Sequence, residues 1–399
     1  MISTENGRLG IYIHIPFCRS KCAYCDFYSF VPGGVEIFDR YTAALCAHMA
    51  YYKDAAKSKT VDTVYIGGGT PTVMPVKYLC KILDTVRRSF RLSKDAEITI
   101  EVNPATADKK TFTKLRRHGV NRVSIGLQSA DEKELRALSR IHSRDEFEDC
   151  FRAARAAKIK NISVDLMFGI PLQTEQSLLH SVDYVTRLHP EHISMYDLKI
   201  EPGTKFAKTY ETLAPPDEDT EYYMYKKAIA LLERRGYMQY EISNFARPGY
   251  ESRHNLRYWH CEEYLGFGPA AHSFFNKNRY SFVRNIERYM RGVEDMAQSA
   301  SITESSEEIS GRAGMGEYIM LGMRLRNGIS FKEFYLRFGC DFRRLYGEKL
   351  DFYIKNGYMR DTGDGIAFTL SGMFVSNYIL SDILSFEDLN AISPVNRFD

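Results

Sequence analysis

The stretch Gly10–Tyr28, GIYIHIPFCRSKCAYCDFY, joins a run of β-branched residues directly to three cysteines. The isoleucine-rich run predicts a buried β-strand. The three cysteines that follow it, Cys18, Cys22 and Cys25, have the spacing C-x3-C-x2-C. A fourth cysteine that would complete a tetrahedral metal site is missing from this stretch. The sequence therefore raises the question of which metal group uses three thiolates.

Length and composition favour an ordinary globular protein with room for two domains, or for one large domain with an appendage. The chain has 399 residues, of which 44% are hydrophobic and 26% are charged. The formal net charge is +3, so we expect no nucleic-acid partner. We find no apolar run of about 18 residues and no signal-peptide core in MISTENGRLG. The eight cysteines then indicate cytoplasmic thiols or metal ligands.

Six apolar runs alternate with segments of helical spacing over the first half of the chain, which predicts parallel strands joined by crossover helices. The near-continuous apolar character of the runs suggests strands that are buried on both faces. Reactive or polar residues stand at the end of each run. In parallel α/β folds, the functional site forms where the carboxyl ends of the strands meet. We therefore predict an α/β fold, an incomplete (β/α)6 barrel with its site at one rim. The helical segments are 38–56, 75–91, 108–118, 131–158 and 174–188.

The chain divides into three parts by sequence pattern. Residues 1–235 form the predicted core barrel, and residues 236–305 form a connecting region that contains HNLRYW. Residues 306–399 form a smaller α-rich, winged-helix-like C-terminal domain, in which YMRDTGDGIAFTL predicts a hairpin. A winged helix often binds DNA, but acidic residues recur in this part and no basic stripe is evident. A lid or packing domain over the barrel mouth is the favoured interpretation.

Thiolate sulfur binds zinc, copper(I) and iron–sulfur clusters, so the three cysteines leave several metals open. A structural zinc site needs four ligands, and the nearest candidates for a fourth, His14 and Cys46, give no familiar zinc spacing. In a [4Fe–4S] cluster, three cysteines ligate three irons, and the fourth iron stays open for a small molecule. The cluster is favoured over zinc, over a disulfide with a spare thiol, and over no metal.

The cysteine triplet just after a strand resembles the radical S-adenosylmethionine (SAM) enzymes. The resemblance implies that SAM chelates the open iron and that the cluster's electron yields a 5′-deoxyadenosyl radical. Tyr24 matches the family's aromatic position before the last cysteine. The turn GGGTPT, with Gly68, Gly69 and Thr70, resembles the segment that holds the amino group of SAM, since glycine lets backbone approach a ligand. A plain tight turn is the alternative.

Four polar residues near the ends of later strands are further candidates for contacts with SAM. Glu101 in EVNP and Gln128 in GLQS need partners if buried, either in SAM or within the protein. Arg140 in SRIHS is suited to binding the SAM carboxylate. The alternative is an internal ion pair between Arg140 and Asp165, which lies in SVDLMFGIP.

Taken together in this order and spacing, these motifs resemble the oxygen-independent coproporphyrinogen III oxidase family over residues 9–275. The resemblance implies that Tyr12 and Lys199 also face SAM. The oxidases hold two SAM molecules, and the positions implied for a second one are Tyr24, Gly69, Thr70, Gln128, Arg140 and Asp165.

Two features separate the chain from the oxidases themselves. Phe27 stands where they carry a further cysteine, and Cys18 follows a shorter leader. HNLRYW, His254–Trp259, resembles instead the signature of the family's heme-chaperone branch, and YLGFGPAAHSF continues that likeness. This resemblance implies heme as cargo, heme-accepting partners such as respiratory enzymes, an electron donor if SAM is cleaved, and a homodimer.

Heme binding gives the HNLRYW segment a chemical role. A histidine can ligate heme iron, and aromatic rings pack on a porphyrin, so His254, Tyr258 and Trp259 are the candidates. Alternatively, His254 and Asn255 cap a turn and Trp259 fills a seam between domains. The nearby residues Tyr264, His260, His272 and Cys261 are weaker candidates that a packed core would equally explain.

Heme binding and delivery is the favoured function, with the cluster in a structural, dimer-promoting or redox role. Oxidative decarboxylation of coproporphyrinogen III through the adenosyl radical is the alternative. A winged-helix nucleic-acid-binding protein is a remote third hypothesis.

Overall fold

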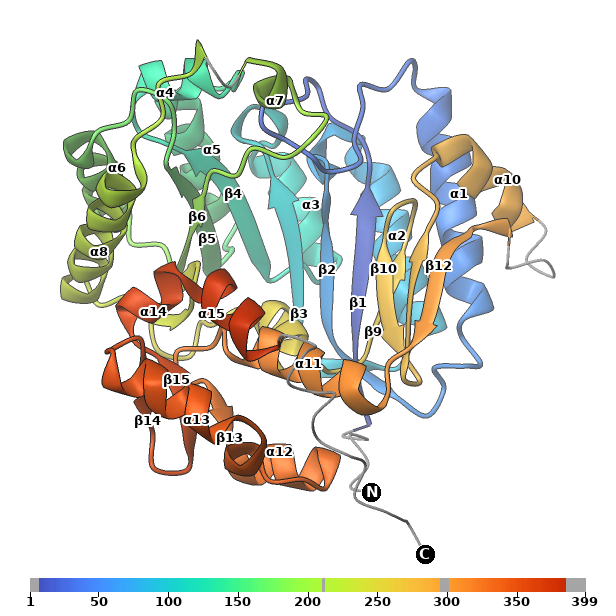
Figure 1. The fold of residues 1–399 in the computed structure, drawn as a ribbon. Coiled ribbons are helices and arrows are strands. Elements are labelled where there is room, and N and C mark those ends of the chain that lie inside the picture. The colour runs from blue at the N-terminus through green and yellow to red at the C-terminus, as the bar shows by residue number, and fades with distance from the viewer. Residues whose placement is uncertain (1–6, 210–211, 295–300, 385–399) are drawn as a thin grey trace, which may run out of the picture.

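The computed structural model describes residues 7–209, 212–294 and 301–384. Residues 1–6 and 210–211 of the predicted first part, 295–300 of the second and 385–399 of the third lie outside these ranges. Its main sheet has the strand order β12-β11-β10-β9-β1-β2-β3-β4-β5-β6-β8-β7 (Figure 1). Strands β1 to β6 are parallel neighbours, which confirms the predicted incomplete (β/α)6 barrel. Their bounds are β1 Arg8–Ile15, β2 Thr60–Gly68, β3 Leu92–Val102, β4 Arg122–Gln128, β5 Asn161–Phe168 and β6 His192–Asp197.

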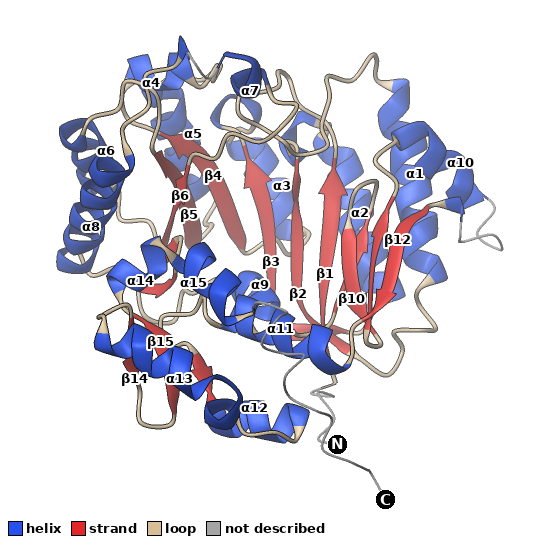
Figure 2. Ribbon diagram, in the orientation of Figure 1, coloured by secondary structure: helices blue, strands red, loops and turns tan. Residues whose placement is uncertain are grey.

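Crossover helices cover the outer face of these strands, behind the sheet in Figure 2. They follow the predicted segments closely, with one exception: the segment 131–158 is two helices, α4 and α5. Ser139 between them has a left-handed φ of 58°, and Ser143 begins α5 with a capping box. The helices are α1 Glu36–Tyr51, α2 Val76–Ser89, α3 Lys109–Arg117, α4 Glu132–Ala137, α5 Arg144–Ala156, α6 Glu175–Arg187, α7 Lys205–Thr209 and α8 Glu218–Arg234, with 3-10 turns η1 Pro71–Val73 and η2 Pro104–Thr106.

The region after α8 extends the sheet at both edges. Strand β9 is parallel to β1, and β10, β11 and β12 add an antiparallel ribbon beyond it. Strand β8 pairs antiparallel with β6, and β7 pairs with β8. The elements are β7 Met238–Glu241, β8 Asn244–Ala246, α9 Arg253–Trp259, β9 Tyr264–Phe267, β10 His272–Phe275, β11 Asn278–Phe282, α10 Ile286–Glu294 and β12 Thr303–Glu308.

The C-terminal elements have an apolar core of their own and lie below the barrel strands in Figure 1. The predicted hairpin is confirmed as the antiparallel pair β14 and β15. Within the described ranges, each helix is too short or too polar to cross a bilayer. The elements are α11 Gly311–Gly322, β13 Ile329–Ser330, α12 Phe331–Phe338, α13 Phe342–Lys355, β14 Met359–Asp361, β15 Gly365–Phe368, α14 Leu370–Phe374 and α15 Ser376–Ile383.

The barrel strands are buried on both faces, as expected, but only the outer face is apolar. Ile11, Ile13 and Ile15 belong to the buried apolar core, whereas Tyr12 and His14 alternate with them and lie on the opposite face. Buried polar side chains continue the inner face across the other strands: Thr63, Thr99, Arg122, Ser124, Ser163, His192 and Ser194. The barrel therefore encloses a polar interior, which suits a polar ligand better than a packed core.

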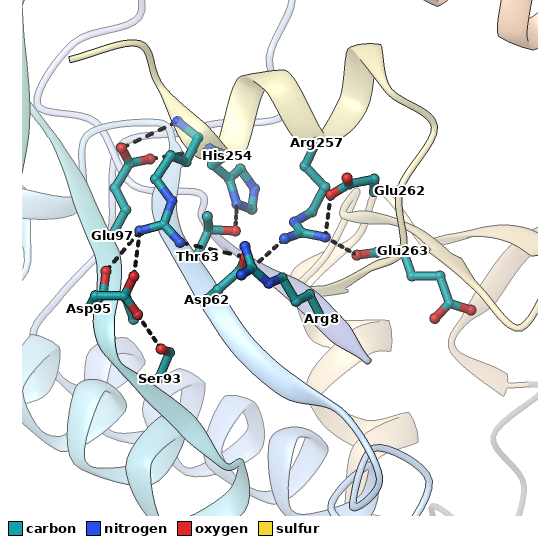
Figure 3. Close-up of polar contacts among 12 residues, drawn as sticks. Arg8, Asp62, Thr63, Ser93, Asp95, Glu97, His254, Arg257, Glu262 and Glu263 are labelled. Carbon is teal, nitrogen blue, oxygen red and sulfur yellow. Dashed lines mark hydrogen bonds and ion pairs between the residues drawn. The ribbon is translucent and has the colours of Figure 1, made fainter. Parts of the chain in front are cut away.

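Helix α9 closes the amino end of this interior (Figure 3). Its first backbone amides, from Arg253 and His254, donate to the carboxylate of Glu97 over 3.3 and 3.2 Å. The ring of His254 is buried, with its Nδ1 2.9 Å from Thr63 Oγ1 and its Nε2 2.9 Å from the Tyr258 hydroxyl. Both imidazole nitrogens are thus occupied within the protein, which indicates a structural role, but the expected turn cap is wrong, because Ser252 caps α9 by accepting from the Asn255 amide.

Arg257 anchors the carboxyl-terminal end of α9 to the start of β2. Its buried guanidinium pairs with Asp62 and lies 2.8 Å from Glu262 (Figure 3). Gly10 on β1 makes room for this side chain, because a Cβ there would lie 2.5 Å from Arg257 Cδ and 3.1 Å from Thr63 Oγ1. Ion pairs at both sides hold the guanidinium, so the arginine has little freedom to move away.

We expect Gly10→Ala to lower the free energy of unfolding by about 1–3 kcal/mol, the usual cost of overpacking a fixed interior. Urea denaturation of the variant and the wild type measures the difference. Gly33→Ala is the matched control, since nothing lies within 4 Å of a Cβ at that position. Equal stability of both variants would contradict the packing described here.

His254 makes stability depend on pH. Burial, followed by the nearby Arg257, lowers the pKa of His254 to about 3. An unfolded histidine titrates near 6.5, so as pH falls below that value the unfolded state takes up a proton that the folded state refuses until about pH 3. This histidine therefore stabilises the fold fully above pH 6.5, and that contribution is lost as pH falls.

We expect the free energy of unfolding to fall less steeply in His254→Gln than in the wild type between pH 6 and 4, by about 1.4 kcal/mol per pH unit. Urea titrations at several pH values measure the two slopes, and only their difference matters, because other buried histidines contribute to both. His180→Gln, at an exposed position, should keep the wild-type slope. Identical slopes for His254→Gln and the wild type would show that the imidazole is not buried as described.

Candidate functional site

The cysteine loop is held against the carboxyl ends of β1 and β2. The Cys18 amide donates to Phe30 O and the Phe30 amide donates to Pro16 O, each over 2.9 Å, which closes the loop at its base. The amide of Thr70 donates to Phe17 O over 2.7 Å, and the Thr70 hydroxyl lies 3.8 Å from Cys18 Sγ. The loop after β1 and the glycine turn after β2 therefore form one unit.

The three thiols share one environment with a cation and a phenol. Arg140 Nη1 lies 3.5 Å from Cys22 Sγ, while its Nη2 donates to Gly126 O over 2.8 Å. Burial raises the pKa of Cys25, and the neighbouring Cys22 and Cys18 raise it further. Burial also raises the pKa of Tyr24, which keeps its hydroxyl protonated beside the cysteines. The break between α4 and α5 is what brings Arg140 to this loop.

The backbone amides of the glycine turn are already used within the protein. The Gly68 amide donates to Glu101 Oε2 over 3.0 Å, and the Gly69 amide donates to Ile15 O over 2.8 Å. Gly68 has a φ of +109°, and a Cβ on Gly69 would lie 2.9 Å from Ile15 O, so both positions require glycine. A ligand at this turn would therefore meet carbonyl oxygens, which suit an ammonium group.

Glu101 lies between the glycine turn and the barrel interior. Its Oε1 accepts a 2.9 Å hydrogen bond from the hydroxyl of Tyr65, a residue that the sequence interpretation missed. Burial raises the pKa of Glu101 to about 7, and the carboxylate of Asp165 adds to this effect. The period-two alternation of YIGG, which places Tyr65 on the same face as Gly67, is the signal that could have revealed this tyrosine.

The remaining predicted SAM contacts lie along the same rim. Asp165 accepts a 3.0 Å hydrogen bond from Ser124, and burial raises its pKa. The described residues contain no direct ion pair between Asp165 and Arg140, although the Arg140 charge opposes the rise in the pKa of Asp165, so the two groups interact at longer range. Gln128 is buried and has a left-handed φ of 73°, a backbone strain typical of functional sites. Lys199 is exposed on the loop after β6.

The rim contains buried polar atoms that lack a partner among the described residues. These include Asn103 Oδ1, just after β3, and Arg140 Nε, beside the cysteines. Buried polar groups are costly unless something satisfies them, so the rim fits a polar ligand with donors and acceptors. In the described ranges, no three His, Cys, Asp or Glu side chains are grouped as a single metal ion would require. The three thiols with their adjacent arginine suit a negatively charged iron–sulfur cluster instead.

A cavity of about 390 Å³ opens beside the cysteine loop, on the inner face of β1 and the added ribbon. Its wall contains Phe27 and Tyr28 from the loop and Tyr258 and Trp259 from the HNLRYW segment. Of the weaker candidates in the sequence, Tyr264, His272 and Cys261 also line it, together with Tyr12. The volume and aromatic lining fall in the range of small-molecule sites.

Strand register explains which side chains meet in this cavity. Tyr264 pairs with Phe274, and Phe274 pairs with Arg279, so all three point to one face. His272, two residues before Phe274, shares that face. Burial, then the nearby Arg279 and Arg284, lowers the pKa of His272. Arg279 and Arg284 also line the cavity, and sequence reasoning missed both, since only the sheet order places them beside the cysteine loop.

Two of the histidines considered for heme do not reach the cavity wall. His254 lies at the amino end of the barrel with both ring nitrogens hydrogen-bonded, and His260 is exposed at the end of α9. Ligation by His254 would require its imidazole to break one of these hydrogen bonds. Tyr258, which bonds His254 and also lines the cavity, connects the two places.

Comparison with solved structures shows that the whole fold is shared with a known enzyme. The structure superposes on coproporphyrinogen III oxidase (HemN) from Escherichia coli, described as a radical SAM enzyme, with a TM-score of 0.83. The match covers 95% of this chain and 90% of the oxidase at 22% sequence identity. At this identity, the likeness establishes the fold alone.

Comparison with protein families and curated sequences is more specific. Residues 12–185 match the Radical SAM superfamily, and residues 309–375 match the HemN C-terminal domain. The heme chaperone HemW of Bacillus subtilis is 33% identical over 376 residues, which cover 94% of this chain and 98% of the relative. The heme chaperone HemW of Escherichia coli is 34% identical over 379 residues, with the same coverage of both chains. The chain belongs to the radical SAM superfamily and, within it, to the family of the heme chaperone HemW.

Proposed function

We propose that this protein binds heme and delivers it to acceptor proteins, and that it carries a SAM-ligated [4Fe–4S] cluster. The observation that carries the proposal is the aromatic cavity between the cysteine loop and the HNLRYW segment. A porphyrin needs a large apolar surface against its faces, and Phe27, Tyr258, Trp259 and Tyr264 supply aromatic rings from three separate elements. Family membership supports the same function.

Cys18, Cys22 and Cys25 would hold the cluster, and the open iron would take SAM. When bound, the pair supplies one-electron chemistry at the sulfonium of SAM. Around it, the carbonyls of Gly68 and Gly69 would accept from the SAM amino group, and Arg140 would balance the negative charge at Cys22.

The other rim residues would bind and orient SAM rather than react with it. Glu101, with a pKa near neutrality, accepts hydrogen bonds in its ionised form and donates one in its protonated form. Asn103 and Gln128 lie at the ends of neighbouring strands and Asp165 lies within the next strand, β5, and these residues would contact the ribose or the amino-acid part. Tyr24 and the apolar residues packed with it, such as Leu138 and Met167, exclude water from the cysteines.

Coproporphyrinogen oxidation is the second candidate, because the same fold serves an oxidase. Phe27 argues against it: this residue occupies the position of the oxidases' further cysteine, and its side chain is 67% exposed at the cavity mouth. An exposed phenylalanine in this place suits contact with an apolar cargo, not thiol chemistry.

The location of the protein, its electron donor, its oligomeric state and its heme acceptors are further parts of the proposal. We infer a cytoplasmic location, because free cysteines and an iron–sulfur cluster suit a reducing compartment, and we infer an electron donor only if SAM is cleaved. Homodimer formation through the cluster region stays a prediction that size-exclusion chromatography of cluster-loaded and cluster-free protein can test. Respiratory enzymes remain the expected acceptors.

The cluster assignment predicts a specific loss. Anaerobic reconstitution with iron and sulfide should give the wild type a broad visible absorption and about four irons per chain. The triple variant Cys18→Ala, Cys22→Ala, Cys25→Ala should lose both, because the cluster's protein ligands are gone. Cys80→Ala, on α2 away from the loop, is the control and should load normally. A triple variant that still loads iron and sulfide would disprove the assignment.

The proposed function also predicts what the protein does with tetrapyrroles. We expect hemin to bind with one-to-one stoichiometry in a titration followed by absorbance. Incubation of the cluster-loaded protein with coproporphyrinogen III, SAM and dithionite should yield no protoporphyrinogen by chromatography. The opposite pair of results, decarboxylation without hemin binding, would establish the oxidase instead.

A further inference from the structure

His14, Cys261 and His272 are the histidine and cysteine side chains that line the cavity beside the cysteine loop. Four tyrosines, Tyr12, Tyr28, Tyr258 and Tyr264, also line it, but burial raises the pKa of each, so their hydroxyls stay protonated and do not ligate iron as phenolates. His14 is not available, since its Nδ1 lies 3.1 Å from the Tyr12 hydroxyl and its Nε2 lies 2.8 Å from Tyr28 O. Burial raises the pKa of Cys261 to about 12, so its sulfur stays a thiol, whereas iron ligation uses the thiolate. These two groups are therefore poor ligands as they stand.

His272 differs from both. Its imidazole makes no hydrogen bond with any other described residue, and it is accessible from the cavity. Strand β10 fixes its direction, because His272 pairs with Ser281 of β11 and lies on the face that also presents Phe274 and Arg279. A neutral imidazole can ligate heme iron, and the strand holds this one in a fixed direction beside the aromatic wall of the cavity.

Arg279 and Arg284 line the same cavity as His272. Arg279 pairs with Glu317 and lies over the ring of Phe274, and its buried Nε has no partner among the described residues. Arg284 donates to the backbone oxygen of Asp26 over 3.0 Å, and its side chain remains 59% exposed. The cavity's own carboxylates are already paired, Asp26 with Arg284 and Glu262 with Arg257.

On the basis of the proposed heme-binding function, we propose that His272 ligates the heme iron in this cavity and that Arg279 and Arg284 bind the heme propionates. The propionates are carboxylates, which arginine binds through charge-assisted hydrogen bonds. His254 is then a positioning residue: it holds Tyr258, whose ring forms part of the cavity wall, and it does not contact the iron.

The test for His272 uses full-length protein, hemin and a spectroscopic readout. Wild-type protein with one hemin should show the magnetic circular dichroism or resonance Raman signature of histidine ligation. His272→Ala should lose that signature and bind hemin more weakly, and added imidazole should restore the spectrum. His180→Ala, an exposed histidine outside the cavity, is the control. Far-ultraviolet circular dichroism verifies that the variants fold.

The test for the arginines compares hemin with its dimethyl ester, which lacks the two carboxylates. Arg284→Gln should weaken hemin binding about tenfold, the share of one charge-assisted hydrogen bond, and should leave ester binding unchanged. Arg288→Gln is the matched control, because Arg288 has a 55% exposed side chain and a similarly long ion pair of 3.8 Å with Glu304.

The outcomes separate the two proposals. If wild-type protein binds no hemin, the proposed function fails. If it binds hemin and the histidine signature persists in His272→Ala, the function stands and the ligand assignment is overturned. Loss of the signature in a folded His254→Gln together with its retention in His272→Ala would assign the iron to His254. An equal effect of Arg284→Gln on hemin and on the ester would rule out propionate binding at that arginine.

Discussion

The pleat of the six parallel strands is the constraint on which the rest of the structure depends. Each strand sends isoleucine, valine and leucine outward onto the helices and polar side chains inward. Such an interior is stable only where its polar groups bond one another across strands, as Tyr65 does with Glu101, Ser124 with Asp165, and Ser163 with His192. The barrel therefore has a polar interior, and its apolar outer face packs against the helices.

The two ends of the barrel differ in the side chains that they present. At the amino end, α9 brings His254 and Arg257 onto Thr63 and Asp62, and the ion pairs and hydrogen bonds there seal the interior (Figure 3). At the carboxyl end, the Nε of Arg140 keeps no partner among the described residues, and Cys25 lies near enough to Cys22 and Cys18 to interact with them electrostatically. Unpaired buried nitrogens occur at both ends, since Arg257 Nε also lacks a partner among the described residues, so it is the three cysteines and the glycine turn that assign the cluster chemistry to the carboxyl rim.

The cysteine loop joins the two proposed sites physically. Its residues Phe27 and Tyr28 line the aromatic cavity, and the Tyr28 hydroxyl accepts a 2.8 Å hydrogen bond from the amide of Ile286 at the start of α10. Arg284, which lines the same cavity, contacts Asp26 one residue after the last cysteine. A change in the loop on cluster binding would therefore reach the heme cavity directly, through covalently adjacent residues.

The sequence by itself determined the strand–helix order, the cysteine triplet and the glycine turn, because these depend on local spacing and on residues next to one another in the chain. It predicted one helix over 131–158, whereas the tertiary structure breaks that helix and places Arg140 against Cys22. Only the tertiary structure decided the role of His254, whose imidazole is occupied by Thr63 from a strand far earlier in the chain. It likewise decided that His272 shares a cavity with the cysteine loop, since contacts between distant segments follow from sheet order, which local patterns do not specify.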